Sequence, residues 1–500
     1  MHVNRREFLR KSICAALGGA SLYSALGSLR LIGAATASQR PSGGFTDYKA
    51  LVCVYLYGGN DSFNTLVPYD NTLYPVYAGT RQGLALAQSD IQANSLNPAG
   101  GSGPGGPPSD GGSYGMHPAM PELRGLFNSG KVAIVSNVGS LLYPITQQQY
   151  QDESVPTPSQ LFSHDDQTNQ WQTSWPDDSN ADGWGGRVAD LLYSSNAGQV
   201  PMSITLSGEN RFQRGSIVNQ YSIDSWGASC SAGGDPDCGP FSVPTMSYLG
   251  DGPESWLIDY DDPNVVANDL AAYNALIANG TQSHVLERAF ADATTRSINN
   301  ATLINTALND VTLQTVFPDT DLGNQLAAVA MLIKVRQTLG MSRQIYFVST
   351  GNYDTHGTQI SDQNDNLTEL SQALAAFYNA TVELGIDSGV TAFTASDFGR
   401  SLTPNSDGTD HGWGGHHFVV GGGVRGQRFY GAMPSLAQYD DNNPGGSNPD
   451  DTGYGQIIPK QSVDQYSATL ATWFGVDAAS LNDIFPNLGR FPSSDLGFMT

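Results

Sequence analysis

The feature that most constrains the fold is a set of short, unbroken apolar runs. The first, Ala50–Tyr57, is rich in β-branched residues and ends at Gly58-Gly59. An apolar run without alternation predicts a strand buried on both faces, as in a parallel sheet. Three further runs follow, each after a helix-like segment: 121–128 before 132–136, 325–339 before 344–349, and 367–384 before 390–394. Because strands and crossover helices alternate, we predict an α/β fold with a mostly parallel central sheet.

The charge of the chain excludes two classes of partner. Among 500 residues, 23 Lys and Arg oppose 47 Asp and Glu, which gives a formal net charge of −24. A nucleic-acid-binding protein needs basic groups to neutralise phosphates, and a peripheral protein needs a basic patch to bind anionic lipid. We therefore predict neither partner. No run after residue 37 approaches the roughly 18 apolar residues of a transmembrane helix, so we also predict no stable membrane span in the mature chain.

Residues 1–37 have the pattern of an export signal. Arg5-Arg6 precede Phe8-Leu9, a weakly apolar stretch follows, and Ala35-Thr36-Ala37 fits a small-x-small cleavage site. Paired arginines in this setting predict a twin-arginine signal that the twin-arginine translocase recognises. The protein would then be periplasmic or secreted, in a bacterium. The alternatives are an ordinary secretory signal and an uncleaved anchor.

Beyond the signal we predict one α/β domain over residues 38–500. Two turn-rich tracts, near 97–115 and 207–261, lack periodicity and are predicted to be loop or cap insertions. In the second tract, Cys230 and Cys238 flank a loop rich in Gly and Asp and could form a disulfide after export. The alternative is a metal pair, but no further Cys or His ligand lies nearby in the sequence.

The residues that follow the predicted strands are candidates for a metal site. Asp61 follows the first strand, Asp354 and His356 follow the third, and Asp397 follows the fourth, with His411 shortly behind. The carboxyl ends of parallel strands face one rim, so we expect these side chains to converge. Asp and His together suit Zn²⁺ or Mn²⁺, whereas carboxylates alone would suit Ca²⁺ or Mg²⁺. The alternative is structural, because a strand-end Asp commonly caps a helix or turn.

A candidate nucleophile precedes these residues in the chain. Ser163, followed by His164, opens a predicted helix that continues toward Gln172. Free backbone N–H groups at a helix start favour an oxyanion or phosphate. The alternative is that Ser163 only caps the helix and His164 packs. Arg187 or Arg400 could hold a phosphate or sulfate by a bidentate contact, or could pair with a local Asp.

The motifs also occur in a recognisable order. After the twin-arginine leader come Gly-Gly-Asn-Asp (58–61), Ser-His before a helix (163–171), Gly-Trp-Gly-Gly-Arg (183–187), Tyr-Asp-Thr-His-Gly (353–357), Ser-Asp-Phe-Gly-Arg (396–400), Thr-Asp-His-Gly-Trp-Gly (409–414) and Gly-Gly-Gly-Val-Arg-Gly (421–426). Together they resemble the exported bacterial family called domain of unknown function 1501, which is grouped with the alkaline phosphatase and sulfatase superfamily. The resemblance implies a three-layer α/β/α sandwich of the alkaline phosphatase type.

The resemblance further implies roles for individual residues. Asp61 resembles the first-strand metal ligand of the superfamily, Asp354 and His356 resemble a ligand pair, and His411 resembles a late histidine ligand. Ser163 resembles the nucleophile at the start of a helix. The residues after it lack the Pro and Arg of the sulfatase motif, which argues against a formylglycine sulfatase.

One position departs from the superfamily pattern. Asp397 resembles the first member of an Asp-His or Asp-Asn pair, but the second member here is Phe398, which cannot bind a metal. A second metal would therefore lack this ligand unless His164 or Asp410 substitutes.

These observations favour an exported, metal-dependent hydrolase of phosphate or sulfate esters. Ser163 would be the nucleophile, with His164 and Arg400 as further catalytic residues, and the Asp and His set would hold a divalent metal such as Zn, Mn or Ca. The alternative is a non-catalytic envelope or polysaccharide-associated protein that retains the fold.

Overall fold

The computed structural model describes residues 45–100, 103–225, 227–232, 241, 243, 284–309, 311–440 and 448–500. The chain divides into two compact units. The larger contains the described residues of Gly44–Ala197, Pro201–Phe241 and Asp310–Thr500; the smaller contains Gly198–Val200 and helix α12 (Val285–Leu308). In these described ranges, no helix is both long and apolar enough to cross a membrane.

Two sequence predictions fall wholly or partly outside the described residues. The signal predicted for residues 1–37 lies there, as does about half of the insertion predicted near 207–261. Cys230 is disulfide-bonded, whereas Cys238, its predicted partner, is also outside the described residues.

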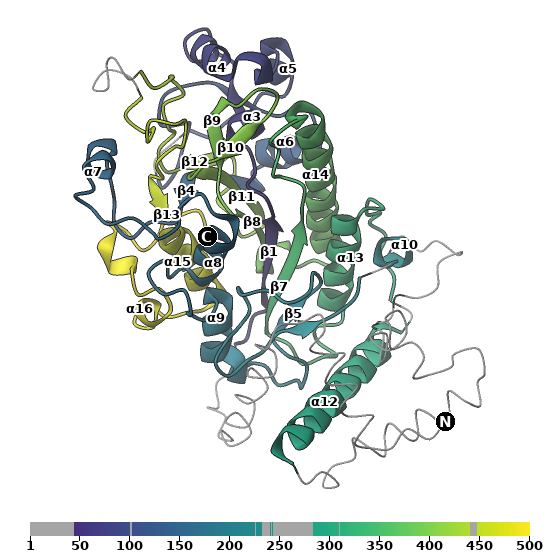
Figure 1. Cartoon of the computed structure of the whole chain (residues 1–500). Helices are drawn as coiled ribbons and strands as arrows, with labels where there is room; N and C mark the ends of the chain where they lie inside the picture. Colours follow the sequence, from purple (N-terminus) through teal and green to yellow (C-terminus); the bar gives the residue numbers. More distant parts are fainter. Residues whose placement is uncertain are drawn as a thin grey trace, which may run out of the picture. The chain divides into compact units, whose positions relative to one another are not determined.

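The larger unit is built on a mostly parallel sheet (Figure 1). Its strands are β1 (Lys49–Leu56), β4 (Val132–Gly139), β5 (Ser203–Thr205), β6 (Tyr221–Ser222), β7 (Arg343–Thr350), β8 (Val390–Ser396), β11 (Gly415–Gly421), β12 (Arg428–Tyr430) and β13 (Gln461–Ser462). The order is β12-β4-β11-β8-β1-β7-β5-β6, with β13 also paired to β4. Among the described strands of this sheet, only β11 is antiparallel to its neighbours. The predicted α/β class is confirmed.

Strand β1 occupies the centre of the sheet because both of its faces are apolar. It pairs in parallel with β7 and β8 along its length, with Leu51 opposite Ile345 and Thr391. All of its residues after Lys49 are buried. Side chains alternate between the two faces of a strand, so odd- and even-numbered residues of β1 enter different halves of the core.

Helices cover both faces of the sheet, so the predicted three-layer α/β/α arrangement is confirmed (Figure 1). One layer contains α6 (Pro121–Asn128), α13 (Asp321–Lys334) and α14 (Gln359–Glu383), and the other contains α8 (His164–Thr173), α9 (Trp184–Leu192) and α15 (Val463–Phe474). The shorter helices are α3 (Ser62–Thr65), α4 (Tyr74–Arg81), α5 (Gln88–Ala93), α7 (Gln147–Gln151), α10 (Ala228–Ala232) and α16 (Leu481–Ile484). Two small antiparallel sheets pair β2 (Leu66–Pro68) with β3 (Tyr114–Met116) and β9 (Arg400–Pro404) with β10 (Thr409–His411).

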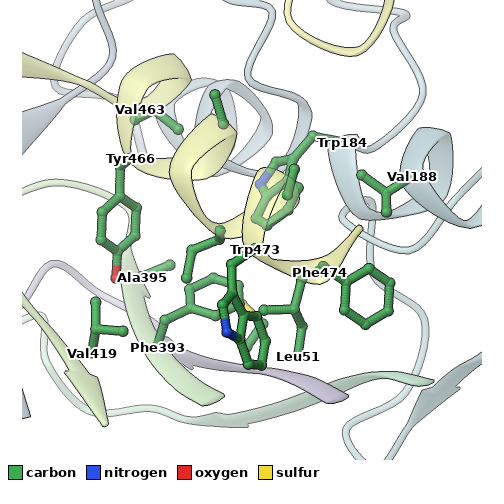
Figure 2. Packing of buried hydrophobic residues seen from close by; sticks show 14 of the residues in the cluster. Leu51, Trp184, Val188, Phe393, Ala395, Val419, Val463, Tyr466, Trp473 and Phe474 are labelled. Carbon is green, nitrogen blue, oxygen red and sulfur yellow. The ribbon is translucent and has the colours of Figure 1, made fainter. Parts of the chain in front are cut away.

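Helix α15 packs on one face of the central sheet and covers the hydrophobic core on that side. Figure 2 shows Tyr466 and Phe474 of this helix packed over the sheet in a cluster that includes Leu51 and Phe393. Burying one such side chain stabilises the fold by about 1.5–3 kcal/mol. The helix begins at a capping box formed by Ser462 with Gln465, which fixes where it starts.

Candidate metal centre

The candidate site lies at the carboxyl ends of three neighbouring strands. The loops after β1, β7 and β8 meet there with β10 and the start of α8. Gly58, directly after β1, has φ +110°, and a Cβ atom on it would lie 2.4 Å from the backbone nitrogen of Asp354. Only glycine permits this approach, so the first loop can lie directly against the second.

Four side chains converge at this rim; we call His164, Asp354, His356 and His411 the His/Asp cluster. Nε2 of His411 lies 3.1 Å from Nε2 of His164 and 3.0 Å from Nε2 of His356. Oδ1 of Asp354 lies 3.0 Å from Nε2 of His356 and 3.3 Å from Nε2 of His411. Oδ2 of Asp354 lies 3.4 Å from Nε2 of His164. The loop after β7, the end of β10 and the start of α8 thus present ligand atoms to a common point.

The outer nitrogens of two of these imidazoles are hydrogen-bonded to protein acceptors. Nδ1 of His411 lies 2.7 Å from the carbonyl oxygen of Phe162, which can only accept, so this nitrogen carries a proton. Nδ1 of His164 lies 2.7 Å from Oδ2 of Asp397, which also accepts from the backbone N–H of Gly58 at 2.9 Å. A neutral imidazole that donates from Nδ1 has a lone pair at Nε2. Two lone pairs therefore face each other across 3.1 Å, which requires a cation or an extra proton.

The donor set fits a divalent transition metal. Tetrahedral Zn²⁺ with ligands at its usual bond lengths places neighbouring ligand atoms about 3.3 Å apart. The contacts within the cluster span 3.0–3.4 Å. Imidazole nitrogens with one carboxylate suit Zn²⁺ or Mn²⁺, whereas Ca²⁺ takes six to eight oxygen ligands. Of the metals expected from the sequence, Zn²⁺ and Mn²⁺ fit the donors better than Ca²⁺.

The surroundings set different protonation states for the members of the cluster. Burial acts to raise the pKa of Asp354, but the hydrogen bond and charge of Arg400 and the charges of nearby histidines outweigh it, and the pKa is lowered. Burial lowers the pKa of His411, and the charge of His164 acts in the same direction. The hydrogen bond to Asp397 raises the pKa of His164. Ionised Asp354 and neutral His411 are the forms that bind a metal, whereas an extra proton held by His164 would have to leave when a metal binds.

Asp61, which the sequence places among the ligands, is not part of the cluster. Its Oδ2 forms an ion pair with Arg81 and accepts from Gln359, and its Oδ1 accepts from the backbone N–H of Phe63 at 2.9 Å. The side chains of Asp61 and Arg81 are 1% and 0% exposed. Asp61 is also the N-cap of α3. Its carboxylate is therefore neutralised within the protein, and the structural interpretation of a strand-end Asp applies to it.

Asp397 contacts the cluster through His164, and its other oxygen, Oδ1, is buried without a hydrogen-bond partner. The ring of the next residue, Phe398, packs against the imidazoles of His164 and His411, with centroid distances of 4.8 and 4.9 Å. Position 398, where the pattern described above would have a metal ligand, therefore provides an apolar side to the cluster.

Both arginines predicted for anion binding are engaged within the protein. Arg400 is fully buried and donates to Asp354, to the carbonyl of Gly58 and to Thr409. Arg187 donates to three backbone carbonyl groups. Arg400 therefore pairs with a local Asp, which is the alternative that the sequence left open. This ion pair fixes the position of Asp354 in the cluster.

Ser163 lies directly before His164, at the N-cap of α8. Its hydroxyl donates to Oδ2 of Asp166 at 2.7 Å, and its side chain accepts no capping hydrogen bond from the helix. The simple capping role therefore does not describe it. The preceding residue, Phe162, has a left-handed φ of +70° and supplies the carbonyl group that holds His411.

Sequence reasoning missed two groups that act at the site, and two further histidines nearby in the sequence are not part of it. The Phe162 carbonyl and the Arg81 partner of Asp61 have no local sequence signal, because backbone groups and isolated arginines occur everywhere. His416 and His417 are buried in β11, and burial lowers their pKa values to about 4 and about 3. They are neutral core residues.

Comparisons with known proteins bear on the family and not on the reaction. No curated protein gives a significant match. Among solved structures, the lipoteichoic acid synthase LtaP from Listeria monocytogenes is similar at a TM-score of 0.31 and 9% identity, over 88% of this chain and 76% of that chain. A family model described as protein of unknown function (DUF1501) matches residues 263–451, a range that holds Asp354, His356, Asp397 and His411. The resemblance to that family is thus confirmed over residues 263–451.

Proposed function

We propose that this chain is an exported, metal-dependent hydrolase of phosphate or sulfate esters. The observation that carries the proposal is the His/Asp cluster, in which imidazole lone pairs and a carboxylate face one point. Such a gathering is unfavourable without a cation, and a cation bound to the native state removes that cost. The side chains of His356 and Asp354 are 46% and 43% exposed, so the cluster is open to a ligand.

Different residues of the site would have different roles in binding the metal. His164, Asp354 and His411 would hold the metal, because their ligand atoms all lie within 4.8 Å of one another, and His356 lies next to His411. A bound divalent cation supplies Lewis-acid stabilisation of the charge on the transferred group. Arg400 orients Asp354 by its hydrogen bond.

Ser163 is the proposed nucleophile. Its hydroxyl already donates to Asp166, so a carboxylate is in position to accept the hydroxyl proton as the oxygen bonds to the ester phosphorus or sulfur. In the same step the bond to the ester alcohol would break and the alcohol would leave with a proton from water. A second water would then cleave the serine ester and release phosphate or sulfate. Ser163 is joined by one peptide bond to His164, which fixes it near the rim.

Ser163→Ala is expected to lower kcat/KM for aryl phosphate or aryl sulfate hydrolysis by at least about 10³-fold, because the attacking group is lost. Metal content should stay unchanged, since Ser163 is not in the cluster. The measurement pairs an aryl-ester assay of the purified mature protein, loaded with Zn²⁺ or Mn²⁺, with elemental analysis. Undiminished hydrolysis by the variant would rule out Ser163 as the nucleophile.

A second candidate function is a non-catalytic envelope or polysaccharide-associated protein. The pairing of Asp61 with Arg81 and the presence of Phe398 favour it, because groups that could hold a second cation are used otherwise. A wild-type protein that binds one metal but cleaves neither ester would select this candidate.

Export is part of the proposal. Arg5→Lys with Arg6→Lys is expected to prevent recovery of the protein in the periplasm, because the translocase recognises the arginine pair. Cell fractionation with immunoblotting measures this, and a variant with Arg10→Lys is the matched control that keeps the pair. Export of the double variant at the wild-type level would contradict a twin-arginine signal.

A further inference from the structure

Asp397 hydrogen-bonds to His164 but is not one of the three residues, His164, Asp354 and His411, that are proposed above to hold the metal. We propose that Asp397 is the positioning residue of His164 and not a metal ligand. This assignment rests on the proposed metal site and deepens it, because it names the residue that determines which nitrogen of His164 is available.

The geometry around Asp397 is fixed from the sheet. Asp397 follows β8 directly and its side chain is 2% exposed. The preceding residue, Ser396, donates to the carbonyl of Leu56 and accepts from the N–H of Asn60, which ties the end of β8 to the loop after β1. The N–H of Gly58 then donates to Oδ2 of Asp397 at 2.9 Å. These hydrogen bonds position the carboxylate of Asp397 independently of its contact with His164.

The held carboxylate defines the tautomer and the ring position of His164. Oδ2 accepts from Nδ1 at 2.7 Å, which keeps the proton on Nδ1 and leaves the lone pair at Nε2, 3.1 Å from Nε2 of His411. Phe398 packs against the face of the same imidazole. A hydrogen bond to an ionised acceptor is stronger than one to a carbonyl, so Asp397 restrains His164 more firmly than Phe162 restrains His411.

The alternative is direct ligation through Oδ1 of Asp397, which is buried and has no hydrogen-bond partner. The two roles predict different numbers of metal ions bound per chain when Asp397 is replaced. Loss of a positioning carboxylate weakens metal affinity by about 10–100-fold but leaves the ligands in place. Loss of a ligand to a second metal lowers the number of metals bound at saturation.

The first test is a titration of the metal-free protein with Zn²⁺ or Co²⁺, followed by elemental analysis at saturation. We expect one metal per chain in the wild type, in Asp397→Ala and in Asp397→Asn. The dissociation constant should rise about 10–100-fold in Asp397→Ala and less in Asp397→Asn, because the amide oxygen can still accept from Nδ1. A wild-type stoichiometry of two that falls to one in Asp397→Ala, or an unchanged affinity, would overturn the assignment.

The second test needs no metal. In metal-free protein labelled with ¹⁵N-histidine, His164 should be protonated at Nδ1 at a pH where its ring is neutral, and Asp397→Ala should shift the population toward the Nε2–H tautomer. His411, which Phe162 holds, is the internal control and should not change. A wild-type His164 protonated only at Nε2 would overturn the assignment even if metal binds. If the wild type binds no metal but shows the Nδ1 tautomer, the proposed metal site fails while the positioning contact stands.

Discussion

His411→Ala is expected to remove bound metal from the purified protein and to abolish hydrolysis that depends on it. Nε2 of His411 is the central atom of the cluster, with ligand atoms of His164, His356 and Asp354 at 3.0–3.3 Å. Without it, only Asp354 still contacts both His164 and His356, and the metal loses the ligand that lies between the two other imidazoles. Metal at 100 times its Kd stabilises a native protein by about 2.7 kcal/mol, so wild-type thermal unfolding should shift upward with metal and the variant should show no shift.

His284→Ala provides the control for this experiment. His284 is exposed and caps α12 in the smaller unit. The variant should keep the metal content and the metal-dependent thermal shift of the wild type. Full metal content in His411→Ala would exclude the cluster as the metal site.

Arg81→Leu is expected to lower the free energy of unfolding by about 3–5 kcal/mol, because it leaves the buried carboxylate of Asp61 without its counter-ion. Arg81 is fully buried and also donates to the carbonyl groups of Ser401 and Leu402, at 3.1 Å each. It therefore joins α4 and β9 to the loop after β1. Denaturant unfolding monitored by circular dichroism measures the change.

Two further variants separate this structural role from metal binding. The double variant Arg81→Leu with Asp61→Leu should recover part of the lost stability, since no buried charge is left unpaired. Asp61→Asn should retain the wild-type metal stoichiometry. Loss of metal in folded Asp61→Asn would return Asp61 to the ligand set.

The central sheet could be predicted from the sequence because a strand that is apolar on both faces must be buried on both faces, as in the centre of a parallel sheet. The run 50–57 became β1 at Lys49–Leu56, and the run 390–394 became β8 at Val390–Ser396. Strand β11 was not predicted. It includes His416 and His417, and its partners β4 and β8 are brought beside it by tertiary packing that no local pattern reports.

For the site, the sequence by itself determined which side chains follow the strands, and parallel strands bring such residues to one rim. Only the tertiary structure decided what each carboxylate does there. Asp61, Asp354 and Asp397 are chemically identical strand-end residues, but Asp61 is paired with Arg81, Asp354 lies among the imidazoles, and Asp397 holds His164. The physical reason is that a carboxylate's role depends on the nearest charge or hydrogen-bond donor. Those partners come from α4, α8 and the loops at the sheet rim, at separations that no local spacing encodes.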